Sequence, residues 1–529
     1  MFSNKTEVFQ VNINLHGLCP EIIMLAAAAL VLLVGLCPRD GVRRSSQWIA
    51  AISLVLAFIA AWNLGPIGDG RHWTLWPLAT YDSMLASGIG LLTVLACWGM
   101  PFLDDPAQPD KAYRGEFFAM LLCSLAGLSM MAKVNDLIWL FLALELVSIP
   151  TYIMVAAGRG NAAAQEAGVK YFFLGALSAA IYLFGFSYLY GFAGSTRFTA
   201  IAAAFHSALA GGHLPYVALI GLLMVVIGIS YKIAAVPLHY YAPDVYQGAA
   251  TPVTAFLSFT PKAAGFFALI IVFNLTGWKL SGPGAPGHVL PDLLMVLAVL
   301  TMFIGNVLAL LQRNIKRLLA YSSIANSGYM LVGLAVGPVR PTGSAINGLS
   351  ATLFYLGAYS LMTVGAFAAL IYLQGKTDAA EDLDDIAGVA GEHPLAAASM
   401  AVCLFSLIGM PGTVGFLGKL FIIQAALAAN HPLLAVLVVI NAAIAAAYYL
   451  RIVAAMYLRD AWTPFTVRRS LAPPFAAALA TVLVIFFGIF PAQLFQQSSA
   501  SGQVVPTAVI SHKPAPVPLA AARPPAYPQ

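Results

Sequence analysis

Long apolar segments follow one another along almost the whole chain, and they leave few folds open to it. Between about residue 20 and residue 495, one stretch after another reaches about 18 residues, enough to cross a hydrocarbon core of roughly 30 Å as a helix. Of the 529 residues, 60% are hydrophobic and only 9% are charged, whereas about a quarter of the residues of a soluble domain are charged. The surplus apolar side chains must face lipid, so the sequence predicts an all-α polytopic membrane protein.

About fourteen membrane-spanning helices are predicted, each to within several residues. Their limits are 20–38, 47–64, 82–103, 116–132, 136–157, 165–191, 214–242, 250–276, 291–312, 318–337, 343–374, 394–428, 432–458 and 472–495. The seventh and twelfth run long for a single helix and carry prolines in the apolar sequence: Pro237, with Pro243 directly after the limit, in the seventh, and Pro411 in the twelfth. Because proline removes a backbone hydrogen bond, both are predicted to be discontinuous. Their spacing predicts two inverted five-helix repeats.

This pattern divides the chain into five parts. They are a three-helix segment at 1–115, a first five-helix repeat at 116–276, a second at 291–458, a last helix at 472–495, and a Pro-rich tail at 496–529. The tail is predicted to be disordered, and residues 198–209 are predicted to form a short external helix lying on the membrane. The loop 377–392 holds six carboxylates; we interpret it as a solvated linker, with docking to a partner subunit as the alternative. Five scattered cysteines predict no disulfide, metal site or iron–sulfur cluster.

Lysine and arginine are distributed unevenly over the predicted loops. Of the 26 basic residues, thirteen lie in loops on one side, six on the other, two in the tail and five inside spans. By the positive-inside rule the richer side is cytoplasmic, and both termini are predicted to lie outside. The positive charges near the first span follow it instead of preceding it, which argues for a retained helix and against a cleaved signal peptide. The same bias explains the net charge of +5 without a nucleic-acid partner.

Four charged residues lie well inside predicted spans: Glu145, Lys232, Lys262 and Lys419. An ionisable residue at the bilayer centre costs about 2.5 to 3.5 kcal/mol on insertion scales, so each needs a partner or a use. For Glu145 and Lys232 a purely structural ion pair is the plain alternative. Lys262 has no second carboxylate at its depth, and burial without a counter-charge disfavours the charged form of a lysine. Such a group can accept and release protons.

The energies involved suit a proton pump. Two unit charges about 4 Å apart at an effective dielectric constant near 20 interact by roughly 4 kcal/mol. Moving one charge through about 180 mV requires roughly 4 kcal/mol. Opening or closing one Glu–Lys pair therefore changes a neighbouring proton affinity by about the work of moving one proton against a membrane potential.

Uncharged polar residues accompany the charges. The tenth span offers Ser322, Ser323, Asn326 and Ser327, which can hold a chain of water molecules. His239 follows Pro237 at the predicted break. We interpret it either as a satisfied polar residue at a helix break or as a proton relay between Lys232 and Lys262 or toward the cytoplasm.

Five stretches of the chain carry a resemblance to a known family. They are ELVSIPTYIMVA, EAGVKYFFLGALSAAIYLFGFSYLYGFAGST, YKIAAVPLHYYAPDVYQGAATPVTAFLSFTPKAAGF, RLLAYSSIANSGYMLVG and GMPGTVGFLGKLF. Together they resemble the antiporter-like subunits of respiratory complex I, over essentially the whole chain apart from the tail.

The resemblance implies a fourteen-helix fold and one proton channel in the membrane arm of a bacterial inner-membrane complex, driven by quinone reduction elsewhere. By motif, Glu145 and Lys232 would be the interacting pair, Lys262 the central proton-holding lysine and Lys419 the lysine leading outward. NADH, FMN, iron–sulfur clusters and quinone would bind to other subunits, so no cofactor and no redox site is expected in this chain. The expected partners are a neighbouring antiporter-like subunit, the small membrane-arm subunits and the lipid bilayer.

Within the family, one type of subunit typically has glutamate at the position of Lys419, and another continues into a long lateral helix where this chain has its Pro-rich tail. The family has three types of antiporter-like subunit, and the resemblance therefore points to the one that has neither of these features. A cation/proton antiporter subunit or a membrane-bound hydrogenase subunit of the same fold remains an alternative, as does a structural membrane-arm subunit without transport. Binding of NADH or flavin by this chain has no support, since it has no glycine-rich motif between strand and helix.

Overall fold

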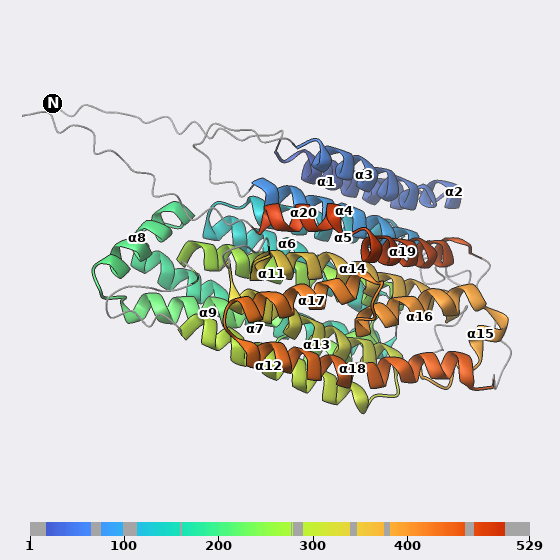
Figure 1. Cartoon of the computed structure of the whole chain (residues 1–529). Coiled ribbons are helices and arrows are strands. Elements are labelled where there is room, and N and C mark those ends of the chain that lie inside the picture. Colours follow the sequence, from blue (N-terminus) through green and yellow to red (C-terminus); the bar gives the residue numbers. More distant parts are fainter. Residues whose placement is uncertain are drawn as a thin grey trace, which may run out of the picture.

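The computed structural model describes residues 17–64, 76–98, 114–158, 161–276, 278, 289–338, 346–374, 381–460 and 470–502. In these ranges the chain is a bundle of roughly parallel and antiparallel helices (Figure 1), with two isolated β-bridges, Asp136 to Arg197 and Asn314 to Asp382. Eleven of the described helices are long and apolar enough to cross a membrane. This confirms the prediction of an all-α polytopic membrane protein. The count of fourteen spans and the two inverted repeats stay predictions.

The helices, in chain order, are α1 (Cys19–Gly35), α2 (Asp40–Arg43), α3 (Ser45–Trp62), α4 (Trp76–Ala96), α5 (Arg114–Met130), the 3-10 turn η3 (Met131–Lys133), α6 (Leu137–Ala157), α7 (Ala162–Ala193), α8 (Phe198–Ala210), α9 (Tyr216–Lys232), α10 (Tyr241–Gly248), α11 (Thr251–Thr276), α12 (Val289–Leu310), α13 (Ile315–Val336), α14 (Gly348–Leu373), α15 (Val389–Glu392), α16 (Pro394–Ile408), α17 (Val414–Ala428), α18 (Pro432–Leu458), α19 (Ala472–Ile489) and α20 (Ala492–Ser501).

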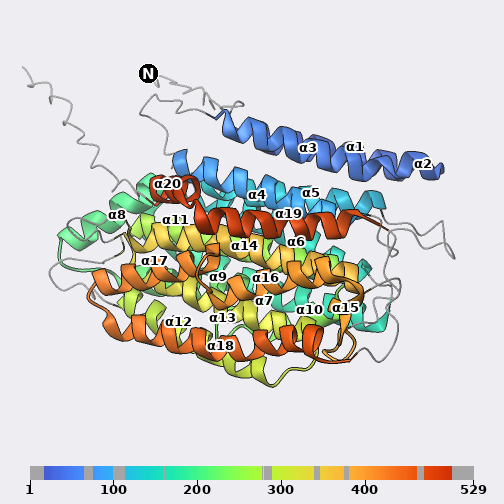
Figure 2. The same cartoon turned by 45° about the vertical axis from the view of Figure 1, so that its right-hand side comes forward.

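Both predicted discontinuities are present. The first lies between α9 and α10 and contains Pro237, and the second lies between α16 and α17 and contains Pro411. The halves of each pair follow one another along the long direction of the bundle (Figure 2). Pro243, by contrast, lies in the first turn of α10, where a missing N–H removes no intrahelical bond. Proline alone does not decide the outcome, since Pro150 and Pro261 lie inside the continuous helices α6 and α11.

Two predicted boundaries are wrong. Helix α4 begins at Trp76 and ends at Ala96 instead of covering 82–103, because the apolar residues before position 82 continue the helix. Residues 496–502 are not disordered: α20 covers 492–501, and the Asn347 side-chain amide donates to the Gly502 carbonyl at 3.0 Å. This stretch contains no proline, so nothing in its backbone prevents a helix. Residues 503–529 lie outside the described part of the chain.

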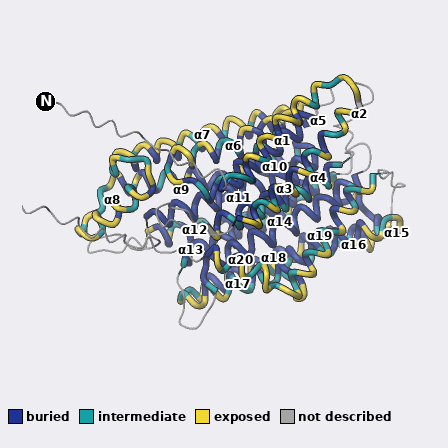
Figure 3. The backbone as a smooth tube through the Cα atoms, turned by 90° about the horizontal axis from the view of Figure 1, so that it is seen from above, coloured by how far each residue is buried: buried dark blue, intermediate teal, exposed yellow. Residues whose placement is uncertain are grey.

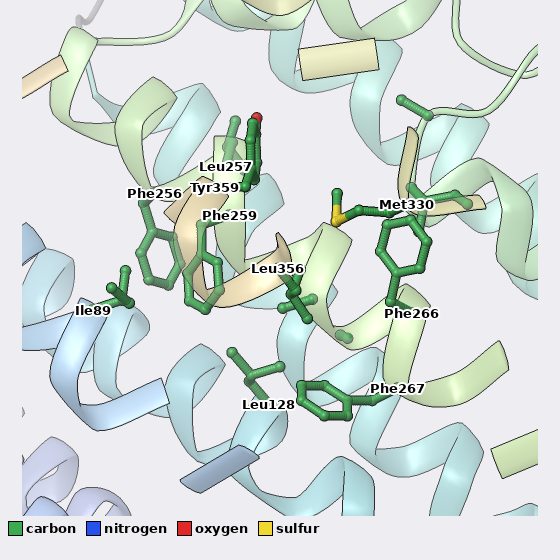
Figure 4. Packing of buried hydrophobic residues seen from close by; sticks show 14 of the residues in the cluster. Ile89, Leu128, Phe256, Leu257, Phe259, Phe266, Phe267, Met330, Leu356 and Tyr359 are labelled. Atoms are coloured by element: carbon green, nitrogen blue, oxygen red, sulfur yellow. The ribbon is translucent and has the colours of Figure 1, made fainter. Parts of the chain in front are cut away.

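The centre of the bundle is formed by α11, α13 and α14. Every residue of α11 is buried, and nearly all residues of α13 and α14 are buried too. Figure 3 shows exposed residues concentrated on the surrounding helices, such as α7 and α8. Within the core, Phe266 and Phe267 of α11 pack near Met330 of α13 and Leu128 of α5 (Figure 4). The enclosed helices can therefore carry polar residues, while the outer helices present apolar faces suited to lipid.

The acidic loop folds back onto its own chain. We name residues 381–388 the acidic strap. The Ile315 N–H donates to the Glu381 carbonyl at 2.7 Å, the Leu383 N–H donates to the Arg313 carbonyl at 3.2 Å, and Arg459 pairs with Asp384 at 2.6 Å. The strap is thus a docked segment of this chain and not a free solvated linker; residues 377–380 lie outside the described ranges.

Helix α8 begins and ends close to the predicted limits of 198–209. It lies at one end of the bundle (Figure 1). Its residues Phe198, Ile201 and Phe205 are buried against neighbouring helices, so one face is anchored to the protein. Contact of its other face with the membrane surface stays a prediction.

Candidate functional site

Glu145 and Lys232 form an ion pair between α6 and α9. Glu145 Oε1 lies 3.4 Å from Lys232 Nζ, and the two side chains are 17% and 4% exposed. Lys232 is the last residue of α9, so the break places its ammonium at the negative end of a half-helix. The structure thus brings together the two residues that the sequence predicted to interact.

Three hydroxyl-bearing side chains complete this pair. Lys232 Nζ donates to Ser148 Oγ at 2.5 Å, and Tyr182 donates its hydroxyl to Glu145 Oε1 at 2.5 Å. The rings of Tyr152 and Tyr182 each lie 6.0 Å from the lysine nitrogen. Each charge keeps a polar partner when the pair opens, because tyrosine and serine hydroxyls both donate and accept.

Lys262 lies in the enclosed helix α11 and is 2% exposed. Its Nζ donates to the Ser323 carbonyl at 2.6 Å and to Ser327 Oγ at 3.0 Å. None of the ion pairs found among the described residues involves Lys262. The partners of this lysine are therefore neutral dipoles, as the sequence predicted when it placed no second carboxylate at this depth.

Lys419, in α17, reaches back to the end of α16. Its Nζ donates to the carbonyls of Leu407 and Ile408 at 2.8 and 2.9 Å, it lies 4.8 Å from the centre of the Tyr329 ring, and it is 5% exposed. These carbonyls belong to the last turn of α16 and have no intrahelical donor. A half-helix end thus supplies the negative pole that holds this lysine.

Helix α13 passes between the sites of Lys262 and Lys419. Ser323 and Ser327 lie on the face that meets Lys262, and Tyr329, farther along, meets Lys419. Ser323 Oγ also accepts from the Tyr359 hydroxyl at 2.7 Å. One helix therefore carries the hydrogen-bond partners of Lys262 and the aromatic ring that faces Lys419.

The other polar face of α13 makes direct contacts with neighbouring helices. Asn326 accepts from the Tyr355 hydroxyl at 2.6 Å and donates to the Ser322 carbonyl at 2.8 Å, and Ser322 bonds to the Tyr449 hydroxyl. The predicted polar residues are thus joined by tyrosines from α14 and α18. Sequence reasoning missed these tyrosines; Tyr355 and Tyr359, four residues apart in one span, were the available signal.

A small cavity connects the first lysine with the second. Its walls include Lys232, Lys262, Tyr171, Tyr241 and Tyr246. The Tyr246 hydroxyl also lies 3.4 Å from Ser323 Oγ, the residue whose carbonyl binds Lys262. The wall is mostly apolar, and the space between the two buried lysines has room for about one water molecule.

His239 lies in the break between α9 and α10 and is half-buried. Its Nδ1 is 3.3 Å from the Pro237 carbonyl. Among the hydrogen bonds of the described residues, none joins His239 to Lys232 or Lys262. The geometry agrees with a polar residue whose hydrogen bonding is satisfied by the backbone of the helix break. The role of His239 as a proton relay stays a prediction.

Comparisons with known proteins place this constellation in a family. A family model described as NADH:quinone oxidoreductase/Mrp antiporter, TM, matches residues 134–445, which include all five predicted site residues. The chain is 35% identical over 504 residues to the NADH-quinone oxidoreductase subunit N of Paramagnetospirillum magneticum, covering 93% of this chain and 98% of that one. It is 36% identical over 523 residues to the protein of the same name from Myxococcus xanthus, covering 92% and 98%.

Solved structures agree with this relationship. A chain of respiratory complex I from Thermus thermophilus matches with a TM-score of 0.72 at 29% identity, covering 91% of this chain and 99% of that one. A chain of the Mrp complex from Dietzia matches with a TM-score of 0.77 at 18% identity, covering 94% and 98%, which shows a shared fold. With the family model matched over more than half of its length and relatives matched over nearly all of it, this chain belongs to the NADH:quinone oxidoreductase/Mrp antiporter family of membrane proteins, among the relatives of subunit N.

Proposed function

We propose that this chain is a proton-translocating subunit in the membrane arm of an NADH-quinone oxidoreductase, and that Glu145, Lys232, Lys262 and Lys419 hold and pass the protons. The observation that carries the proposal is the set of three lysines that are 2 to 5% exposed inside one helical bundle. Two of them are bound by neutral groups alone among their described partners. A buried lysine without a counter-charge is suited to exchange its proton.

The Glu145–Lys232 pair is the element that a neighbouring conformational change would switch. While the pair is closed, the carboxylate stabilises the charge of Lys232. When it opens, that charge acts across the cavity on Lys262 and disfavours a proton there. Two unit charges about 4 Å apart, as in the closed Glu145–Lys232 pair, interact by roughly 4 kcal/mol at an effective dielectric constant near 20. This energy is about the work of moving one charge through about 180 mV.

From Lys262 the proton would pass along α13 toward Lys419. Ser323, Ser327 and the tyrosines bound to this helix each carry a hydroxyl that donates and accepts. Lys419 would then release the proton toward the outer side. His239 would serve, as a secondary element of the proposal, to relay protons between the break and the cytoplasm.

The surroundings of the chain form part of the same proposal. We expect it in the bacterial inner membrane with both termini outside, beside another antiporter-like subunit and the small membrane-arm subunits. NADH, FMN, iron–sulfur clusters and quinone would bind to other chains, and this chain would contribute no redox site. The relatives named NADH-quinone oxidoreductase subunit N support placement in such a complex.

Replacement of Lys262 tests the proposal. In the assembled complex reconstituted into vesicles, Lys262→Ala should abolish proton transport coupled to quinone reduction. The matched control is Lys170→Ala, since the Lys170 side chain is 42% exposed; this variant should transport as the unchanged protein does. If transport survives in an intact Lys262→Ala complex, the chain is a structural subunit.

The matched family also contains Mrp antiporters, so a cation/proton antiporter is the second candidate function. The two are separated by the coupling ion. Transport that persists unchanged when sodium is replaced by choline supports proton translocation alone. Transport that requires sodium, and moves it in the opposite direction, supports antiport.

A further inference from the structure

A second set of buried charges lies in the N-terminal part of the bundle. Glu21 comes from α1, Asp82 from α4 and Lys133 from η3. Their side chains are 3%, 0% and 8% exposed respectively, and Lys133 Nζ lies 2.6 Å from Glu21 Oε1. None of these residues belongs to the proposed proton path, whose lysines are Lys232, Lys262 and Lys419.

Serine and backbone donors bind the two carboxylates. The Ser129 hydroxyl contacts Glu21 Oε1 and lies 2.8 Å from Ser83 Oγ, while the Ala132 N–H donates to Asp82 Oδ2 at 3.1 Å. Two oxygens remain: Glu21 Oε2 and Asp82 Oδ1 are buried and have no hydrogen-bond partner among the described residues. A buried carboxylate oxygen without a donor is costly, by about 1 to 3 kcal/mol or more.

The charges of the cluster do not balance. Two ionised carboxylates and one ammonium leave one negative charge, and in the described part of the chain the helices packed on α4 do not offset it. These are α3, α5, α11, α14, α19 and α20. Helices α3, α14, α19 and α20 contain no charged residue, α5 carries Arg114 and Glu116 at its other end, and α11 carries only Lys262.

One bound proton removes this imbalance. Transferring an uncompensated ion into a protein interior costs several kcal/mol, and a carboxyl group avoids this by remaining neutral. Glu21 accepts from both Lys133 and Ser129, so it is the carboxyl held in the ionised form. Asp82 accepts one hydrogen bond and keeps a free oxygen, so it is the carboxyl that takes the proton.

We propose that Glu21, Asp82 and Lys133 form a proton-binding site that holds one proton on Asp82 and exchanges it with the membrane face at which η3 lies. Lys133, in the turn between α5 and α6, gives the site its path toward that face. Toward α11, Ile89 of α4 packs near Phe256 and Leu128 of α5 packs near Phe267 (Figure 4). These apolar side chains separate the site from Lys262 and the rest of the proposed proton path.

Infrared spectroscopy of the whole complex in vesicles tests the site. At neutral pH, Asp82→Asn should remove one carbonyl stretching band of a protonated carboxylic acid, and in the unchanged protein this band should shift in D2O. The control is Asp292→Asn, an exposed carboxylate on α12, which should remove no such band. Loss of a carboxylate band in Asp82→Asn would overturn the proposal, because Asp82 would then be ionised.

A second variant tests the charge balance. Lys133→Met leaves Glu21 without its counter-charge, so a second protonated carboxyl band should appear. An unchanged spectrum in a folded Lys133→Met complex contradicts the balance on which the proposal rests. The result does not depend on the proposed pumping function, since the bands are measured without turnover.

Discussion

The two broken helices hold their lysines in different ways. Lys232 ends the half-helix α9 and faces a carboxylate, Glu145, at 3.4 Å. Lys419 comes after the second break and reaches back to the last carbonyls of α16 at 2.8 and 2.9 Å. Both lysines lie at the negative end of a half-helix. One is therefore held by a group that can be protonated or moved away, and the other by backbone dipoles that cannot.

This difference suggests a division of labour. A carboxylate partner makes the strength of binding at Lys232 depend on the state of a second ionisable group. The carbonyls at Lys419 change only if the end of α16 moves. Under the proposed function, the first site would be the one that is switched, and the second would hold a proton in a fixed geometry.

The largest effect is expected for Lys232→Met. It leaves Glu145 partly buried without a counter-charge, which destabilises the fold by about 3 kcal/mol and stops proton transport. The yield of assembled complex and vesicle acidification measure the two effects. The double variant Glu145→Gln with Lys232→Met should recover assembly without recovering transport. Recovery of neither would show that the pair does not account for the loss of stability.

A smaller loss of stability is expected for Lys419→Met. It removes the donor to two carbonyls instead of isolating a charge, at a cost of about 2 kcal/mol, while transport should fall as far as in Lys232→Met. Thermal inactivation of the complex measures the first quantity and vesicle acidification the second. A loss of stability as large as that of Lys232→Met would remove the contrast between the two sites.

Gly409 sharpens the description of the second site. It ends α16 with φ +96°, and a Cβ there would lie 3.2 Å from Lys419 Cδ. Gly409→Ala should cost about 1 to 2 kcal/mol of strain and also reduce proton transport by displacing the lysine. Gly412→Ala is the matched control: φ is +87° but a Cβ there meets nothing within 4 Å. Equal transport by both variants would mean that the position of Lys419 is not critical.

The smallest effect concerns the acidic strap. Burial, and then the neighbouring carboxylates led by Asp385, raise the pKa of Asp382. The docked strap thus favours the protonated form, so docking is strongest below the ordinary pKa of an aspartate and weakens as pH rises through the raised value. Asp382→Asn should protect the Ile315 and Leu383 amides from hydrogen exchange at neutral pH. Asp384→Asn should instead lower protection, since it removes the ion pair with Arg459; the reverse order would contradict this assignment.

Much of this architecture follows from local sequence rules. Apolar length located the spans, and Pro237 and Pro411 located both breaks, because each effect acts within a few residues. The Glu145–Lys232 contact could be predicted because each charge lies deep in a span and needs a partner. The carbonyls that hold Lys419 could not, since they come from a helix end eleven and twelve residues earlier, and their approach depends on the fold of the break.

The N-terminal cluster was missed for a related reason. Glu21, Asp82 and Lys133 lie near the ends of their predicted spans, where side chains normally reach water. Helix α4 begins at Trp76, earlier than predicted, which places Asp82 inside the helix instead of at its first residue. The ends of α1, α4 and α5 then pack against one another, and this packing buries the three side chains. The position of a residue along its own span does not predict burial of this kind.

The complete enclosure of α11 has a consequence for where this protein can work. Lys262 is surrounded by protein on every side, so its side chain is solvated by other groups of the chain and not by lipid. Changes in acyl chain length, unsaturation or headgroup composition act first on the outer helices. The central lysine is insulated from them, and its chemistry should remain constant while a cell adjusts its membrane to temperature or diet.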